Sequence, residues 1–134
     1  MTRPVRGILV DPFACTVTDV ELDSIDLANL HRMLSHEVYP VRSLALAYCP
    51  FLRLGEAIYV DNVSLETPVR LFRITGLEPP LAGKGLILGT DKEGTAISAS
   101  SSLWLITAAV TFAQMREGRL IPISTPWAPR EAQT

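Results

Sequence analysis

The sequence predicts an α+β fold, in which a small mixed, mainly antiparallel sheet carries one or two packed helices. Two observations predict it. Short apolar runs rich in β-branched residues recur along the chain between Pro, Gly, Asp and Asn residues, which is the pattern of strands and turns. Residues 25–37 instead repeat leucine at helical spacing.

The first two strands are predicted at residues 5–10 and 15–22. The first run is apolar and β-branched, and Asp11-Pro12 closes it as a turn. The second run is rich in threonine and valine, which favour strands. Because the connection between them is short, we expect an antiparallel hairpin.

A helix is predicted at residues 25–37. Three leucines lie on one face of this helix: Leu27, Leu30 and Leu34. Asp23 and Ser24 are candidate N-caps, and Asp26 would place an acid in the first turn. Pro40 prevents the helix from continuing.

Four further strands are predicted in the middle of the chain, each closed by turn residues: 42–48, 56–60, 70–75 and 86–88. A loop that contains two consecutive prolines is expected at 77–83, and a polar turn at 89–94.

Residues 103–115 leave two alternatives open. Serines at 100–102 are candidate N-caps for a short helix near 103–108. The β-branched and aromatic residues at 110–112 then favour a last strand, but one helix through Gln114 has the same apolar pattern.

The chain is predicted to be a soluble, cytoplasmic protein without a membrane span. Its longest uncharged stretch, residues 95–115, begins with a polar half. The apolar part, 103–113, is about half of the roughly 20 residues that a transmembrane helix needs. Cys15 and Cys49 have no pairing pattern, and we expect reduced, buried thiols.

The chain of 134 residues is predicted to form a single α+β domain at 1–118 and a flexible, Pro-rich C-terminal tail at 119–134. Three prolines interrupt the tail, and no amphipathic period replaces them. Trp127 within it would either dock on its own domain or contact a partner.

Composition points to a partner protein rather than to nucleic acid. The formal net charge is −2, and the arginines are dispersed, whereas a nucleic-acid binder usually has a basic patch. Charged residues make up 19% of the chain and the mean hydropathy is +0.26. Either a sheet buried on both faces or a surface that meets a host protein or a second copy would explain these values.

No catalytic residue, metal site or cofactor is predicted. A zinc site would need both cysteines with His31 and His36 from separate segments, and two histidines five apart lie on different helix faces. The acids Asp61, Asp91 and Glu93 are explained by turns. The serines at 98–102 lack the Gly-x-Ser-x-Gly pattern of a nucleophile.

The most distinctive segment is Gly83-Lys84-Gly85, which precedes a buried strand and the turn residues Thr90 and Asp91. These five residues are the candidate ligand site, because glycine N–H groups and one cation could bind an anion. The segment is not a P-loop, since its glycines are one residue apart and a strand follows. The simpler interpretation is a tight turn that requires glycine, with Lys84 in water.

The Leu-Ala-Gly-Lys-Gly loop at 81–85 and the strand through Gly-Thr-Asp at 89–91 also carry a resemblance. With the segments 8–12, 16–18, 58–61 and 72–74, they resemble small uncharacterised proteins of bacteriophages, prophages and plasmids, several of which carry a domain-of-unknown-function label. The resemblance covers about residues 5–115. It transfers no catalytic residue, and it implies a mobile-element accessory protein in a bacterial cytoplasm.

Two functions follow as expectations. The first is a non-enzymatic protein-binding module, such as a mobile-element accessory or counter-defence protein that acts on a host protein. The alternative is binding or turnover of a small anionic ligand, such as a nucleotide, at Gly83-Lys84-Gly85.

Overall fold

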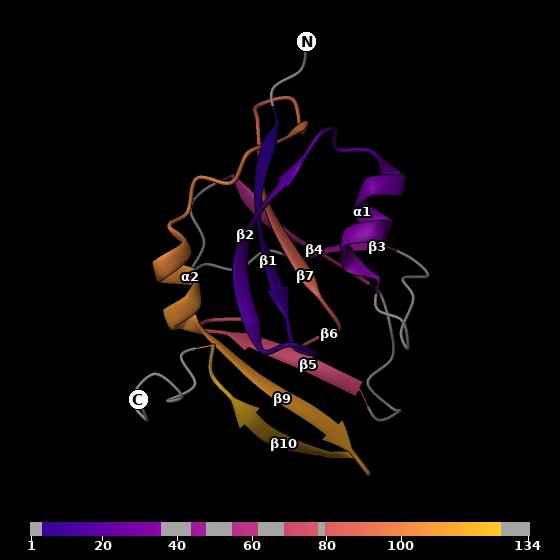
Figure 1. The fold of residues 1–134 in the computed structure, drawn as a ribbon, viewed down its shortest axis with the longest axis vertical. Helices are drawn as coiled ribbons and strands as arrows, with labels where there is room; N and C mark the ends of the chain where they lie inside the picture. The colour runs from indigo at the N-terminus through magenta and orange to yellow at the C-terminus, as the bar shows by residue number, and fades with distance from the viewer. Residues whose placement is uncertain (1–3, 36–43, 48–54, 62–68, 78–79, 127–134) are drawn as a thin grey trace.

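The fold contains two sheets and two short helices in the part of the chain that the structure describes (Figure 1). It is seen in a computed structural model, which describes residues 4–35, 44–47, 55–61, 69–77 and 80–126. The helices are α1 (Leu27–Leu34) and α2 (Leu103–Ala109).

The first sheet consists of β1 (Val5–Asp11), β2 (Thr16–Leu22), β3 (Leu44–Ala47), β4 (Glu56–Asp61), β7 (Gly85–Thr90) and β8 (Ala96–Ile97). Its strand order is β2-β1-β7-β4-β3, and β8 also pairs with β7.

The second sheet consists of β5 (Val69–Ile74), β6 (Leu81–Ala82), β9 (Val110–Arg116) and β10 (Arg119–Ser124), in the order β10-β9-β5-β6. All pairings among the described strands are antiparallel. The predicted α+β fold is confirmed, with the difference that its strands form two sheets rather than one.

The layers follow from which side chains each sheet buries. One core cluster joins Ile8, Ile58 and Ile87 of the first sheet to Phe72 and Phe112 of the second. A second cluster lies on the other face of the first sheet, where Leu30 and Leu34 of α1 cover Leu86 and Leu88. The first sheet is therefore packed between α1 and the second sheet, and β7 is buried on both faces, which accounts for its uninterrupted apolar sequence.

The predicted hairpin is confirmed, with β1 paired to β2 from Val5↔Leu22 to Asp11↔Thr16.

Helix α1 begins two residues later than predicted, and its N-cap is Asp26 rather than Asp23 or Ser24. The Asp26 carboxylate accepts a hydrogen bond from the N–H of Asn29 at 2.8 Å. The helix ends at Leu34 because Ser35 is extended, and the last two residues of the predicted helix, 36 and 37, lie outside the described residues.

The structure resolves the two alternatives at 103–115. Helix α2 ends at Ala109, and Val110 turns to extended backbone and starts β9. Strand β9 then pairs with β5 from Val69↔Met115 to Ile74↔Val110. Val110 and Phe112 enter the core between the sheets, so pairing and burial together favour the strand over a longer helix.

The predicted tail is wrong in its first part, because Arg119–Ser124 form β10 and pair with β9. The density of proline predicts an unpaired tail, but β10 is an edge strand, where a missing N–H is tolerated. The pairing shifts between Pro122 and Ser124, as expected of a bulge at such a site. Trp127 lies outside the described residues. A second short strand, β6, also falls inside the predicted loop at 77–83.

Helices α1 and α2 have eight and seven residues. Both are far shorter than the roughly 20 apolar residues that a bilayer requires. Within the described ranges, then, no helix could cross a membrane.

Candidate functional site

The predicted glycine-lysine loop forms a turn between β6 and β7 rather than an open anion cradle. Gly83 has a φ of +74°, which is the left-handed conformation that favours glycine, and its N–H bonds the carbonyl of Arg70 at 2.9 Å. Lys84 does not extend into water, because its Nζ lies 4.0 Å from Oδ2 of Asp11 and both side chains are mostly buried. The cation of this loop therefore already has a partner.

Gly85 is required because the core leaves no room for a side chain at this position. A Cβ atom at this position would lie 2.5 Å from Cζ of Phe72 and 3.1 Å from Cγ2 of Ile58. The absence of a side chain therefore lets the ring of Phe72 pass directly over β7, at the centre of the core between the two sheets.

Thr90 and Asp91 lie at the opposite end of β7 from Gly85. Gly85 and Thr90 are five residue steps apart along the strand, which corresponds to about 17 Å at 3.3 Å per residue. Oδ1 of Asp91 accepts hydrogen bonds from the N–H groups of Glu93 and Thr95, both at 2.9 Å. The structure thus places Asp91 in a turn and does not bring the five predicted residues together.

A second cation, which the sequence did not reveal, approaches the same turn as Lys84. Nη1 of Arg70 donates to the carbonyl of Pro12 at 3.2 Å. The Asp11 carboxylate bridges the turn by accepting from the N–H of Phe13 at 2.9 Å. Arg70 and Lys84 are 14 residues apart in sequence, and only the passage from β5 through β6 to β7 brings them together.

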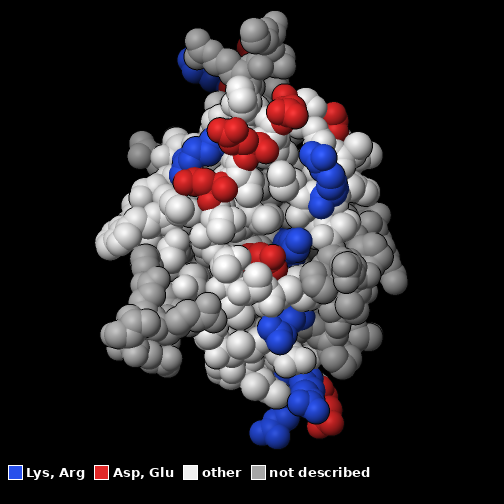
Figure 2. Space-filling model, viewed as in Figure 1, with Lys and Arg blue, Asp and Glu red and all other residues white. Residues whose placement is uncertain are grey.

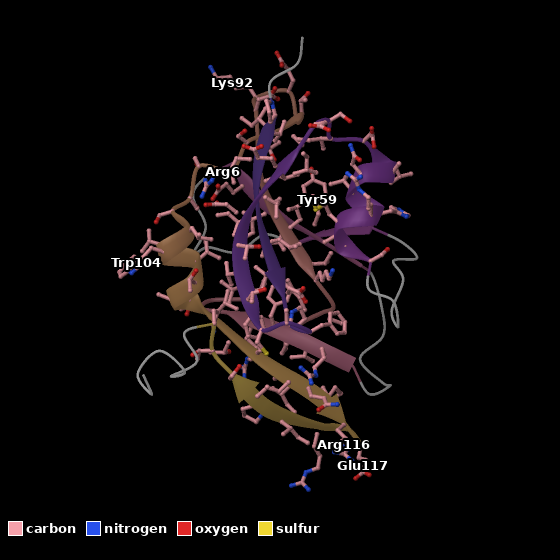
Figure 3. The ribbon with its side chains drawn as sticks, in the orientation of Figure 1. Arg6, Tyr59, Lys92, Trp104, Arg116 and Glu117 are labelled. Atoms are coloured by element: carbon pink, nitrogen blue, oxygen red, sulfur yellow. The ribbon has the colours of Figure 1, made fainter. Side chains whose placement is uncertain are left out.

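The most exposed apolar residues next to a groove lie on α2. Trp104 is 64% exposed and Leu105 is 48% exposed, whereas Ile106 on the inner side is buried. In Figure 3 the indole of Trp104 extends from α2 into solvent. A groove of about 460 Å³ lies between α2 and β2, and it is lined by Thr16, Val17, Thr18, Leu103, Trp104, Thr107 and Pro126. We call Trp104, Leu105 and this groove the α2 face.

The α2 face is not among the predicted sites, although one signal in the sequence indicates it. Helix α2 carries no charged residue, and the consecutive residues Trp104, Leu105 and Ile106 cannot all point to one side of a helix. A helix that is apolar all round is either fully buried or exposes part of that surface. The structure shows the second case.

Two charged side chains from the first sheet hold the segment that leads into α2. Nη1 of Arg6 donates to the carbonyls of Ala99 at 2.9 Å and Ser101 at 3.0 Å. The buried carboxylate of Glu56 accepts from the N–H groups of Ser100 at 2.7 Å and Ser101 at 2.9 Å. We call Arg6 and Glu56 the clasp.

The prediction that a serine at 100–102 caps the helix is correct in position but not in hydrogen bonding. Ser102 is the N-cap of α2, but its side chain makes no capping hydrogen bond. The hydroxyl of Ser101 instead donates to the Glu56 carboxylate. Ser101 precedes the N-cap position, and its hydrogen bond to a charged acceptor is stronger than one to a neutral group.

Charge is distributed unevenly over the surface. Figure 2 shows acidic side chains gathered over the upper part of the view, around β1, β2 and the β7–β8 turn, while Lys and Arg predominate over the β9–β10 hairpin below. Arg6 pairs with Asp19 of β2 at 2.8 Å. Among the residues that the structure describes, no three His, Cys, Asp or Glu side chains are grouped as metal ligands.

Comparison of the chain with protein-family models, with curated proteins and with solved structures finds no match. Any function proposed for this chain therefore depends on its own geometry.

Proposed function

We propose that this chain is a non-enzymatic protein-binding module that recognises its partner through the α2 face. The resemblance to mobile-element proteins adds a context, in which the module is an accessory or counter-defence protein that acts on a host protein. The observation that carries the proposal is the exposure of Trp104 beside an apolar groove.

The energy available from Trp104 is sufficient for an anchor residue. A large aromatic side chain buries about 150–250 Å² in an interface. With roughly two-thirds of that area still exposed, a partner that covers Trp104 would gain about 2.5–4 kcal/mol at 25 cal/mol per Å². Tryptophan is enriched among the few residues that dominate interface energies.

The clasp supports the proposal because it positions α2 before any partner binds. Arg6 and Glu56 together make four hydrogen bonds to backbone groups of Ala99, Ser100 and Ser101. Ordering a surface during binding costs free energy, and a surface that is already ordered avoids this cost.

The test compares two substitutions that remove equally exposed apolar side chains. Trp104 on α2 and Leu27 on α1 are both 64% exposed. The full chain, Trp104→Ala and Leu27→Ala are each immobilised and used to capture proteins from lysates of several bacterial hosts. We expect a partner that the wild type and Leu27→Ala retain and that Trp104→Ala loses, and the purified pair should show the same order by calorimetry. Equal capture by Trp104→Ala contradicts the proposal.

A second candidate is binding or turnover of a small anionic ligand such as a nucleotide. One observation favours it, namely that Lys84 and Arg70 approach the turn at Asp11 and Pro12. Asp11 opposes it, because its carboxylate occupies the place that an anion would take.

Thermal unfolding with a panel of nucleotides tests this candidate. A ligand at a hundred times its dissociation constant adds about 2.7 kcal/mol to the free energy of unfolding. Such a shift should vanish in Lys84→Ala and increase in Asp11→Asn, which removes the competing charge. A shift that neither substitution changes places the ligand elsewhere.

A further inference from the structure

We infer that the partner docks as an extended strand on the free edge of β2, with Lys or Arg side chains beside Asp19 and Glu21 and an apolar side chain in the groove next to α2. This inference rests on the proposed function and adds the chemistry of the partner.

The hydrogen bonds of Arg6 show which backbone groups of β2 point outward. The N–H of Arg6 donates to Oγ of Ser98 at 2.9 Å, and its carbonyl accepts from the N–H of Ala99 at 2.8 Å. Both groups therefore point away from β2, so Arg6 and its partner Glu21 form a non-hydrogen-bonded pair.

The alternation of an antiparallel ladder extends this result along β2. Asp19 lies opposite Ile8 and Val17 opposite Val10, at steps of two residues from the Glu21 pair. The N–H and C=O groups of Val17, Asp19 and Glu21 thus face the outer edge. Within the described ranges β2 pairs with β1 alone, which leaves three residues of unpaired backbone, the template that strand addition uses.

The charged residues on β2 indicate which kind of partner strand could bind there. Asp19 and Glu21 are both exposed on β2. The Asp19 carboxylate is already paired with Arg6 at 2.8 Å, so a partner cation would meet chiefly the charge of Glu21. In Figure 2 acidic side chains lie over the upper part of the view, interspersed with basic ones. An antiparallel pairing of β2 with a second copy, centred on Asp19, would place the two Asp19 carboxylates opposite each other, which is unfavourable. Acidic residues on an edge block self-association, and they favour a partner strand that carries Lys or Arg.

The size of the apolar surface also argues for a segment rather than a second copy. A stable dimer buries about 800 Å² on each partner, and Trp104 with Leu105 supplies only a fraction of that area. The groove of about 460 Å³ beside Thr16 to Thr18 falls within the range of roughly 300–1,000 Å³ that small binding pockets show. It lies at the end of the free edge, where a bound strand would place one apolar side chain against Leu103.

Two synthetic hexapeptides serve as probes: Lys-Thr-Lys-Thr-Val-Thr (the Lys/Val peptide) and Glu-Thr-Glu-Thr-Val-Thr (the Glu/Val peptide). Antiparallel pairing places their charged residues opposite Glu21 and Asp19 and their valine opposite Val17, which packs on the same core cluster as Leu103. They are titrated into the isotope-labelled full chain, and amide exchange is followed by NMR. In the free protein, the amides of Val17, Asp19 and Glu21 should exchange fast, and those of Thr18 and Val20 slowly. The Lys/Val peptide should slow the exchange of these three fast amides, and the Glu/Val peptide should not. This protection by the Lys/Val peptide should decrease as the salt concentration increases.

The variant Glu21→Lys gives the matched charge test. The substitution replaces an attractive cross-strand pair by a repulsive one. It should lower the affinity of the Lys/Val peptide roughly two- to tenfold and raise the affinity of the Glu/Val peptide. Equal binding of the two peptides, binding that leaves the three amides unprotected, or no binding by either peptide overturns the inference.

Failure of the inference can be told apart from failure of the proposed function. If a captured partner is lost by Trp104→Ala but binds Glu21→Lys with unchanged affinity in calorimetry, the α2 face stands and strand docking is overturned. If Trp104→Ala keeps the partner, the proposed function itself is overturned.

Discussion

The carboxylate of Glu56 in β4 accepts hydrogen bonds from both the backbone N–H and the hydroxyl of Ser101, the residue that precedes the N-cap of α2. Glu56 is only 5% exposed. One buried charge on the first sheet thus sets the start of the helix that carries Trp104.

Replacing Glu56 by Ala should destabilise the protein strongly. The substitution leaves the N–H groups of Ser100, which is exposed, and Ser101, which is buried, without their acceptor. An unsatisfied buried donor costs about 1–3 kcal/mol, and the substitution also removes the packed side chain of Glu56 itself. We expect a loss of about 2–5 kcal/mol in the free energy of unfolding, measured by urea denaturation. Glu56→Gln should lose less, because it keeps one acceptor oxygen. Glu93→Ala, an exposed control, should change it by less than about 0.5 kcal/mol.

Alanine and asparagine should differ in the stability they cost at Gly83 and at Gly85, and the order of the two should be reversed between the positions. Gly83 has a positive φ and open space where a Cβ atom would lie, so Gly83→Ala should cost about 1–2 kcal/mol from the backbone alone. Gly83→Asn should cost less than Gly83→Ala, since asparagine tolerates this conformation. Gly85→Ala should cost about 1–3 kcal/mol through the clash with Phe72, and Gly85→Asn should cost more. Urea denaturation of the four variants measures these losses, and the same order of Ala and Asn at both positions would contradict the two assignments.

Helix α1 should loosen at low pH. The N–H of Asn29 and then the hydroxyl of Ser24 hold the pKa of the Asp26 carboxyl below its usual value. A carboxyl with a lowered pKa stabilises the fold above the usual aspartate range, and the stabilisation is lost as pH falls through the lowered pKa. The free energy of unfolding should therefore fall below about pH 4. In Asp26→Asn this part of the pH dependence should disappear, because asparagine caps the helix without titrating. An identical pH profile in the two proteins would exclude Asp26 as its source.

The two sides of α2 should differ in what they contribute to stability. Trp104→Ala should alter the free energy of unfolding by less than about 0.5 kcal/mol, as for other exposed positions. Ile106→Ala, which removes a buried side chain of the main core, should cost about 2–5 kcal/mol. If Trp104→Ala costs as much as Ile106→Ala, Trp104 belongs to the core rather than to a binding surface.

Of the predicted ligand site, the local sequence correctly indicates the backbone turn at Gly83 but not the neighbours of its side chains. The glycine-lysine loop is a turn that needs glycine, as its sequence indicates, because backbone conformation at Gly83 depends on nearby atoms. The partner of Lys84 is Asp11, 73 residues earlier in the chain, and no spacing rule connects them. Thr90 and Asp91 are close to Lys84 in sequence, but an extended strand between them converts a short sequence separation into a large distance.

Three elements can be predicted from local signals alone: the β1–β2 hairpin, helix α1 and the apolar strand β7. Turn residues and side-chain periodicity act within a few residues, so they can be read without the rest of the chain. Long-range packing, in contrast, makes Val110 the start of a strand, pairs Arg119–Ser124 despite Pro122, and leaves Trp104 exposed. Each of these depends on which distant strand supplies hydrogen bonds or covers a side chain, and that choice is made by packing the two sheets together.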